Sequence, residues 1–154
     1  MPPSAILLDA NLLVLLVVGL ASPDYISRHK RLKAFTIEDF ELLRGLLTSV
    51  QRIIVTPNIV TETSNLAGQI SEPARGRIFT VLRALLAGLV EVYEPSQSCA
   101  ATEPFLRLGI TDAASLAVRM DDLTILTTDL DLYLESARVG RGAINFNHHI
   151  AANR

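Results

Sequence analysis

The chain has 154 residues, of which 49% are hydrophobic and 19% are charged. This balance supplies enough apolar surface for one buried core and excludes a disordered chain, and the length favours a single domain over residues 1–154. The formal net charge is -2, so the chain lacks the overall basic field of many nucleic-acid-binding proteins. We assign four of its 16 acidic residues to a metal site below, and the other 12 acidic residues stand against 14 basic ones. Net charge therefore excludes no nucleic-acid partner.

The N-terminal segment from Ala5 to Ala21 is almost entirely apolar. Asp9 and Asn11 interrupt it, and no basic residue precedes it, so the pattern favours neither a membrane span nor a signal peptide. We predict a buried strand that leads into a buried helix. A lone cysteine, Cys99, excludes an internal disulfide and is typical of a cytoplasmic protein, in which we expect this thiol to be structural.

The first half of the chain alternates short strands with helices. A strand is predicted at Ala5–Leu8 and a helix from Asn11 to Leu20. Thr36 opens a capping sequence, after which apolar residues recur at helical spacing, and the β-branched run Arg52–Val55 predicts a second strand. Thr56 and Pro57 then form a typical helix start.

The second half continues this alternation. Ser71-Glu72-Pro73 opens a long helix, Val90–Tyr93 reads as a third strand, and a loop is expected at 94–99. The remaining predictions are a helix at Ala100–Leu108 ended by Gly109, a helix capped by Thr111, a strand at Leu123–Thr127, a helix to about Val139 and a short strand at Ala143–Phe146. Together these elements predict an α/β fold, a three-layer α/β/α sandwich with a mostly parallel central sheet.

Four acidic residues fall where one edge of such a sheet would gather them. Asp9 follows the first strand, Asp129 follows the strand that ends at Thr127, Asp112 lies in the first turn of a helix, and Glu62 lies in the helix after the second strand. The carboxyl ends of parallel strands meet at one edge, where open α/β sheets bind ligands.

Four carboxylates in one pocket repel each other unless a cation lies between them. Hard oxygen ligands without His or Cys favour Mg²⁺ or Mn²⁺. We therefore predict that Asp9, Glu62, Asp112 and Asp129 are catalytic metal ligands. Asn11, Asn65 and Thr127 are candidate supporting residues that orient the carboxylates or bind metal-coordinated water.

Each acid also has an ordinary structural explanation. Asp9 and Asp129 can be helix caps, Asp112 can stabilise a helix dipole, and Glu62 can be a solvated helix residue. Asp131 competes with Asp129, although it lies farther from the strand. The metal-site prediction depends on all four positions together.

A basic run spans residues 28–33. Its cationic members Arg28, Lys30, Arg31 and Lys33 are candidate RNA-binding residues, because phosphate contacts dominate nucleic-acid affinity, but a solvated loop is an equal alternative. Near the C-terminus, His148 and His149 are adjacent; in a strand they would point to opposite faces, so we expect a surface tail.

At the four acids the sequence resembles the PIN-domain family of nucleases. The resemblance comprises four segments in order along nearly the whole chain: ILLDANLL (Ile6–Leu13), VTPNIVTETSNL (Val55–Leu66), LGITDAASLA (Leu108–Ala117) and ILTTDLDLY (Ile125–Tyr133). Each segment alone is weakly specific, whereas the ordered set is more so.

This resemblance implies an endoribonuclease that uses Mg²⁺ or Mn²⁺ and an activated water to hydrolyse RNA phosphodiester bonds. It also implies a homodimer and, for small bacterial members, a toxin held by a cognate antitoxin protein. The segment at residues 28–33 and the long apolar first helix make this chain longer than compact toxins of the family, which leaves the toxin role open.

Two alternatives remain at this point. One is a non-catalytic PIN-like scaffold that binds RNA or a protein partner. The other is a different α/β enzyme, such as a phosphoryl-transfer hydrolase or a receiver domain. Those enzymes need paired acids or a lysine in set places, and this chain has Asp9-Ala10-Asn11, only Lys30 and Lys33, and no glycine-rich phosphate loop.

Overall fold

The computed structural model describes residues 2–154 and contains one five-stranded sheet in which every pair of neighbouring strands is parallel. The strand order is β3-β2-β1-β4-β5, so the first strand is central. This confirms the predicted α/β class. The strands are β1 (Ala5–Leu8), β2 (Arg52–Val55), β3 (Val90–Glu91), β4 (Leu123–Thr127) and β5 (Gly142–Asn145).

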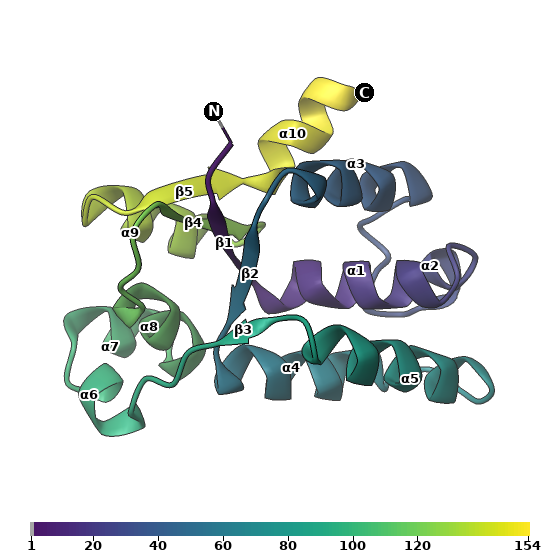
Figure 1. The fold of residues 1–154 in the computed structure, drawn as a ribbon, viewed down its shortest axis with the longest axis horizontal. Coiled ribbons are helices and arrows are strands. Elements are labelled where there is room, and N and C mark those ends of the chain that lie inside the picture. The colour runs from purple at the N-terminus through teal and green to yellow at the C-terminus, as the bar shows by residue number, and fades with distance from the viewer. Residues whose placement is uncertain (1) are drawn as a thin grey trace.

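Helices cover both faces of the sheet and form the outer layers of the sandwich (Figure 1). The helices that connect β1 to β2 and β2 to β3 lie on one side, and those that connect β3 to β4 and β4 to β5 lie on the other. The helices are α1 (Ala10–Ala21), α2 (Tyr25–Arg28), α3 (Ile37–Thr48), α4 (Pro57–Ala67), α5 (Ala74–Leu86), α6 (Ser96–Ala100), α7 (Glu103–Leu108), α8 (Ile110–Ala117), α9 (Leu130–Arg138) and α10 (Phe146–Asn153).

The apolar N-terminal segment forms the centre of the core. All four residues of β1 are buried, and α1 is buried along most of its length because it packs against α3, α4 and α5. Helix α1 has 12 residues and is therefore about 18 Å long, much less than the roughly 30 Å of a bilayer's hydrocarbon core. Among residues 2–154 no helix is long and apolar enough to cross a membrane.

The predicted helix starts at Thr36 and Thr56 are confirmed. Thr36 and Asp39 form a reciprocal capping box at the start of α3, and the Thr56 hydroxyl accepts a hydrogen bond from the Ile59 N–H at the start of α4. Pro57 occupies the first turn of α4, where a missing N–H costs nothing. These caps fix the direction in which α4 leaves the carboxyl end of β2.

Some predicted boundaries are wrong. The third strand has only two residues, Val90 and Glu91, and the segment expected as a loop at 94–99 contains most of α6. Helix α8 begins after Gly109, whose φ of 85° lies in the left-handed region, rather than at a Thr111 cap. The C-terminal segment forms α10 instead of a tail, because Phe146 and Ile150 are buried.

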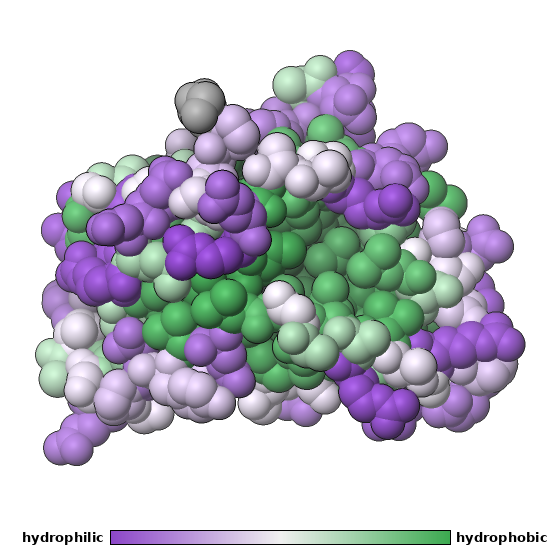
Figure 2. Space-filling model, viewed as in Figure 1, coloured by the Kyte–Doolittle hydropathy of each residue, from purple (hydrophilic) through white to green (hydrophobic). Residues whose placement is uncertain are grey.

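Apolar side chains also gather on part of the surface. Figure 2 shows them at the centre of one face, over β2 and between α3 and α5. Leu46, Leu47, Ile53 and Leu85 from these elements pack against the core but are only partly buried. Polar and charged residues surround this apolar area.

Candidate metal site

Asp9 lies at the carboxyl end of β1 and caps α1. Its side chain accepts hydrogen bonds from the Ala10 N–H at 2.9 Å and from the Thr127 hydroxyl at 2.6 Å, and only 7% of the residue is exposed. Thr127 ends the neighbouring strand β4 and is fully buried. The two strands at the centre of the sheet therefore fix the position of this carboxylate.

Asp129 is joined to the same hydrogen-bond chain. Its N–H donates to the Thr127 hydroxyl oxygen at 2.9 Å, and its own side chain caps α9 by accepting from the N–H groups of Asp131 and Leu132. Both of those bonds end on Oδ1 of Asp129. Oδ2 makes no hydrogen bond to residues 2–154, so it can accept a ligand.

Glu62 and Asp112 come from two different helices, α4 and α8. The capped start of α4 places Glu62 in its second turn, and the backbone of Gly109 places Asp112 in the first turn of α8. Thr111 lines the same pocket as Glu62. It does not cap α8, because the residue before that helix is Gly109.

These four acids line one pocket with a volume of about 320 Å³. The remaining lining comes from Asn11 and from uncharged residues, so no Lys, Arg or His of the described chain lines it. Within residues 2–154, no three His, Cys, Asp or Glu side chains form a ready-made metal-ligand cluster. The carboxylates surround the pocket without converging on one point.

The crowding of negative charge is strongest at Asp112. Burial raises the pKa of Asp112 to about 7, and the charges of Asp9, Asp129, Glu62 and Asp131 add to this rise. At neutral pH a large fraction of this carboxyl is therefore protonated when no cation is present.

The pKa values of Asp9 and Glu62 are raised as well. Burial raises the pKa of Asp9 above its ordinary value, although the hydrogen bonds from Thr127 and Ala10 oppose the rise. The pKa of Glu62 is also raised, by burial and then by the charge of Asp9, against the lowering effect of the nearby Thr111 side chain. The pocket thus holds negative charge that nothing in the described protein neutralises.

This donor set fits a hard divalent cation. Carboxylate oxygens of Asp9, Glu62, Asp112 and Asp129, with the amide oxygen of Asn11 at the rim, are the ligand types that Mg²⁺ and Mn²⁺ prefer. A cation would also oppose both the burial and the repulsion that raise the pKa values of Asp9, Glu62 and Asp112.

The other two polar candidates from α4 and α9 lie outside this pocket. Asn65 lines an adjoining groove of about 520 Å³ together with Asn58 and Thr61, and the groove shares Glu62, Ile110 and Thr111 with the metal pocket. Asp131 is exposed and is not among the residues that line the pocket. Asp129, rather than Asp131, is the acid of this segment that reaches it.

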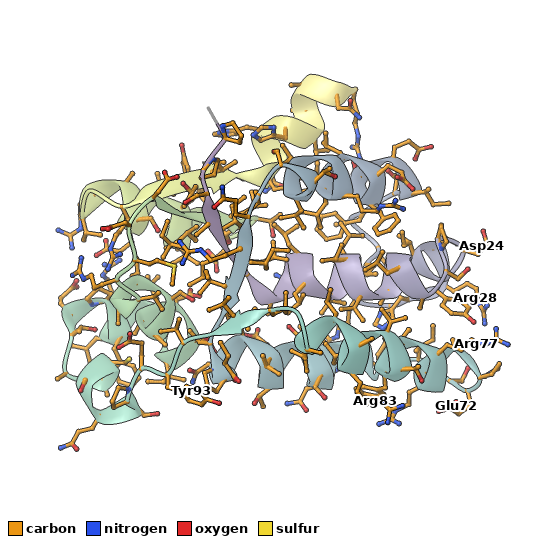
Figure 3. The ribbon with its side chains drawn as sticks, in the orientation of Figure 1. Asp24, Arg28, Glu72, Arg77, Arg83 and Tyr93 are labelled. Carbon is orange, nitrogen blue, oxygen red and sulfur yellow. The ribbon has the colours of Figure 1, made fainter. Side chains whose placement is uncertain are left out.

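The basic run is not brought to the acidic pocket. Helix α1 starts at the pocket and carries the chain about 18 Å away before Arg28 is reached. Figure 3 shows Arg28 and Arg77 at that far end of the molecule. Arg28 lies over the ring of Tyr25, and Arg77 donates to the Tyr25 hydroxyl at 2.8 Å. Lys30, Arg31 and Lys33 are exposed there.

Two other sequence features are placed away from the site. Cys99 is a buried free thiol whose pKa is raised by burial, in agreement with the structural role expected for it. His148 and His149 lie in α10, and the His148 ring packs edge-on against Tyr133.

Sequence reasoning placed Asn58 on the helix face of Glu62 and Asn65, but it did not find Gly109, Ile110 or Thr61 as parts of the site region. The spacing between Gly109 and Asp112 was the available signal, since a left-handed glycine immediately before a helix redirects the chain. Comparisons with protein-family models, with curated proteins and with solved structures found no match to this chain.

Proposed function

We propose that this chain is an endoribonuclease that hydrolyses RNA phosphodiester bonds with Mg²⁺ or Mn²⁺, as the resemblance to PIN-domain nucleases suggests. The observation that carries the proposal is the pocket at the carboxyl edge of the sheet, which acids from four separate elements line and no Lys, Arg or His of the described residues joins. A divalent cation supplies charge to stabilise a phosphate in the transition state and acidifies bound water.

The chain's own residues have distinct tasks in this proposal. Asp9, Asp129 and Asp112 hold the cation together with Glu62, and Thr127 keeps Asp9 in place through its 2.6 Å hydrogen bond. Asp112, whose pKa is raised to about 7 in the cation-free protein, would release its proton as the cation binds. The adjoining groove gives the amide groups of Asn58 and Asn65 as hydrogen-bonding partners for the neighbouring nucleotide.

The test is cleavage of a mixed pool of labelled RNAs by the purified full chain. We expect cleavage with Mn²⁺ or Mg²⁺ and none with EDTA. Asp9→Asn and Asp112→Asn should each reduce the rate at least 100-fold, because each removes a ligand from the cation. Asp24→Asn is the matched control at the far end of the molecule (Figure 3), and it should keep the wild-type rate.

A second candidate, a PIN-like scaffold that binds RNA or a protein without cleaving it, is favoured by one observation. The acids do not form a ready-made ligand cluster within the described residues. Calorimetric titration with Mn²⁺ separates the two functions. If the chain is a nuclease, it should bind Mn²⁺ saturably, and Asp9→Asn should abolish this binding. If the chain is a scaffold, no Mn²⁺ binding in this pocket is expected. Full cleavage activity in both variants would exclude this pocket as the active site.

A further inference from the structure

A second pocket lies beside α8 and shares no lining residue with the acidic pocket. It has a volume of about 360 Å³, within the range of roughly 300–1,000 Å³ typical of small-molecule sites. Leu116 and Ala117 of α8 give it an apolar wall, and Ser98 and Thr102 add hydroxyl groups. The charged residues that line it are Arg119 and Arg141.

Arg141 is held rigidly in this pocket. Its two terminal nitrogens donate to the carbonyl oxygens of Val118 and Leu116, both at 2.6 Å, at the C-terminal end of α8. These bonds cap the helix, and this structural role accounts for the orientation of the guanidinium. They leave its positive charge without a counterion and leave further N–H donors available.

Arg119 brings a second positive charge to the same pocket. Among residues 2–154 neither Arg119 nor Arg141 is within ion-pair distance of a carboxylate. Burial and the charge of Arg119 both lower the pKa of Arg141, and the charge of Glu94 only partly opposes them. Two arginines therefore line one cavity, and no carboxylate of residues 2–154 lies within ion-pair distance of either.

The chain neutralises its other pocket-lining arginines. Arg107 and Arg138 line a separate surface pocket with Glu103 and Glu135, and both arginines form ion pairs with these acids. Arg119 and Arg141, in contrast, line the α8 pocket with no such acid among its lining residues. A bound anion would supply the missing charge, and the guanidinium fork suits a carboxylate or a phosphate.

We infer that the α8 pocket, lined by Leu116, Ala117, Arg119 and Arg141, binds a small molecule that joins an anionic carboxylate or phosphate group to an apolar body. The anionic group lies between the two guanidinium groups, and the apolar part contacts Leu116 and Ala117. This inference is independent of the proposed ribonuclease, because the acidic pocket and the α8 pocket share no lining residue.

The test measures binding to the full chain by calorimetry with four probes. Benzoate and phenyl phosphate combine an apolar ring with each kind of anionic group; benzamide lacks the charge, and inorganic phosphate lacks the ring. We expect saturable binding of benzoate or phenyl phosphate and at least tenfold weaker binding of benzamide and inorganic phosphate. The stronger of the two aromatic anions identifies the preferred anionic group.

Two variants localise the binding. Arg119→Gln removes an exposed cation that makes no hydrogen bond in the described chain, and we expect affinity to fall about tenfold. Ala117→Leu fills the cavity and should abolish binding. Arg52→Gln, an exposed arginine on β2, is the matched control and should change nothing.

Three results would overturn the inference: equal affinity for benzoate and benzamide, wild-type affinity in Arg119→Gln, or no saturable binding of either aromatic anion. Circular dichroism establishes that each variant is folded. If Ala117→Leu does not fold, Arg119→Gln decides the matter, since its side chain lies at the surface.

Discussion

Glu135 and Asp112 are both carboxylates withdrawn from solvent, but their charges are handled in opposite ways. The Glu135 side chain is 3% exposed and lies 3.0 Å from Nη2 of Arg107 and 2.6 Å from Nη2 of Arg138. These arginines lower the pKa of Glu135 to about 2. The charged groups that act on Asp112 are all acids, and burial together with their charges raises its pKa to about 7.

The difference shows that burial does not by itself determine the charge state of an acid in this protein. At Glu135 the protein completes its own ion pairs. At Asp112 it leaves several acids unopposed, and this arrangement costs folding free energy unless a ligand compensates for it. Such a cost is typical of a functional site rather than of a structural one.

The largest expected effect on stability is that of a divalent cation. At a Mn²⁺ concentration about 100-fold above Kd, the cation should stabilise the fold by about 2.7 kcal/mol, which raises Tm by roughly 5–10 °C at pH 8. Thermal unfolding followed by circular dichroism measures the shift. The Asp9→Asn variant should show no Mn²⁺-induced rise in Tm, and the Glu135→Gln variant should show the same rise as the wild type. An equal shift in Asp9→Asn would place the cation elsewhere.

Neutralising Asp112 should stabilise the cation-free protein. Its folded pKa of about 7 lies above the ordinary 3.8, so the cost of its charge is fully present above pH 7 and disappears as the pH falls toward 4. Allowing for solvent screening of a partly exposed group, Asp112→Asn should gain about 1–2 kcal/mol at pH 8.

Urea unfolding in the presence of EDTA measures this gain. The free energies of unfolding of the variant and the wild type should become equal near pH 4, where both side chains are uncharged. A loss of stability at pH 8 would mean that the Asp112 carboxylate has an unrecognised partner, and the contrast with Glu135 would fail.

At Glu135, in contrast to Asp112, removing the negative charge should destabilise the fold. Its folded pKa lies below its ordinary 4.5, so its stabilisation is present above that pH and is lost as the pH falls toward 2. Glu135→Gln should lower Tm at pH 7 by roughly 2–4 °C. The difference should shrink in scans at lower pH; a constant difference would show that packing, not charge, is lost.

The smallest expected effect concerns the basic run at residues 28–33, whose cations form no ion pair within the described chain. Replacing Lys30, Arg31 and Lys33 with glutamine should weaken binding of single-stranded RNA and reduce the slope of log K against log salt by up to about 2. Filter binding at several salt concentrations measures the slope. An unchanged slope would remove these residues from the RNA surface.

The strand ends that carry Asp9 and Asp129 could be predicted because the information is local. Ala5–Leu8 and Leu123–Thr127 are short apolar runs, each followed closely by an acid, and the structure has both strands with these bounds. The parallel order of the sheet then determines that the ends meet. The same argument placed Glu62 after β2.

The features that were missed depend on contacts between distant segments. Helix α10 contains Asn147, His148 and His149, which resemble a polar tail, and it is recognisable only when Phe146 and Ile150 are seen to pack in the core. The remoteness of Arg28–Lys33 was hidden for a similar reason. Sequence spacing alone does not say which way α1 leads the chain from the pocket.

Because of Thr127, the relative position of Asp9 and Asp129 in the acidic pocket is determined by the sheet and not by the surrounding loops. Its buried hydroxyl joins two acids, donating to Asp9 and accepting from the Asp129 backbone, while β1 and β4 pair directly with Leu8 opposite Leu126. Insertions in the surface connections would therefore leave the separation of these two acids unchanged. Thr127→Val would preserve the apolar packing but remove the hydroxyl that connects Asp9 with Asp129. Tolerance to mutation should therefore be lowest at this interior position, although its side chain carries no charge.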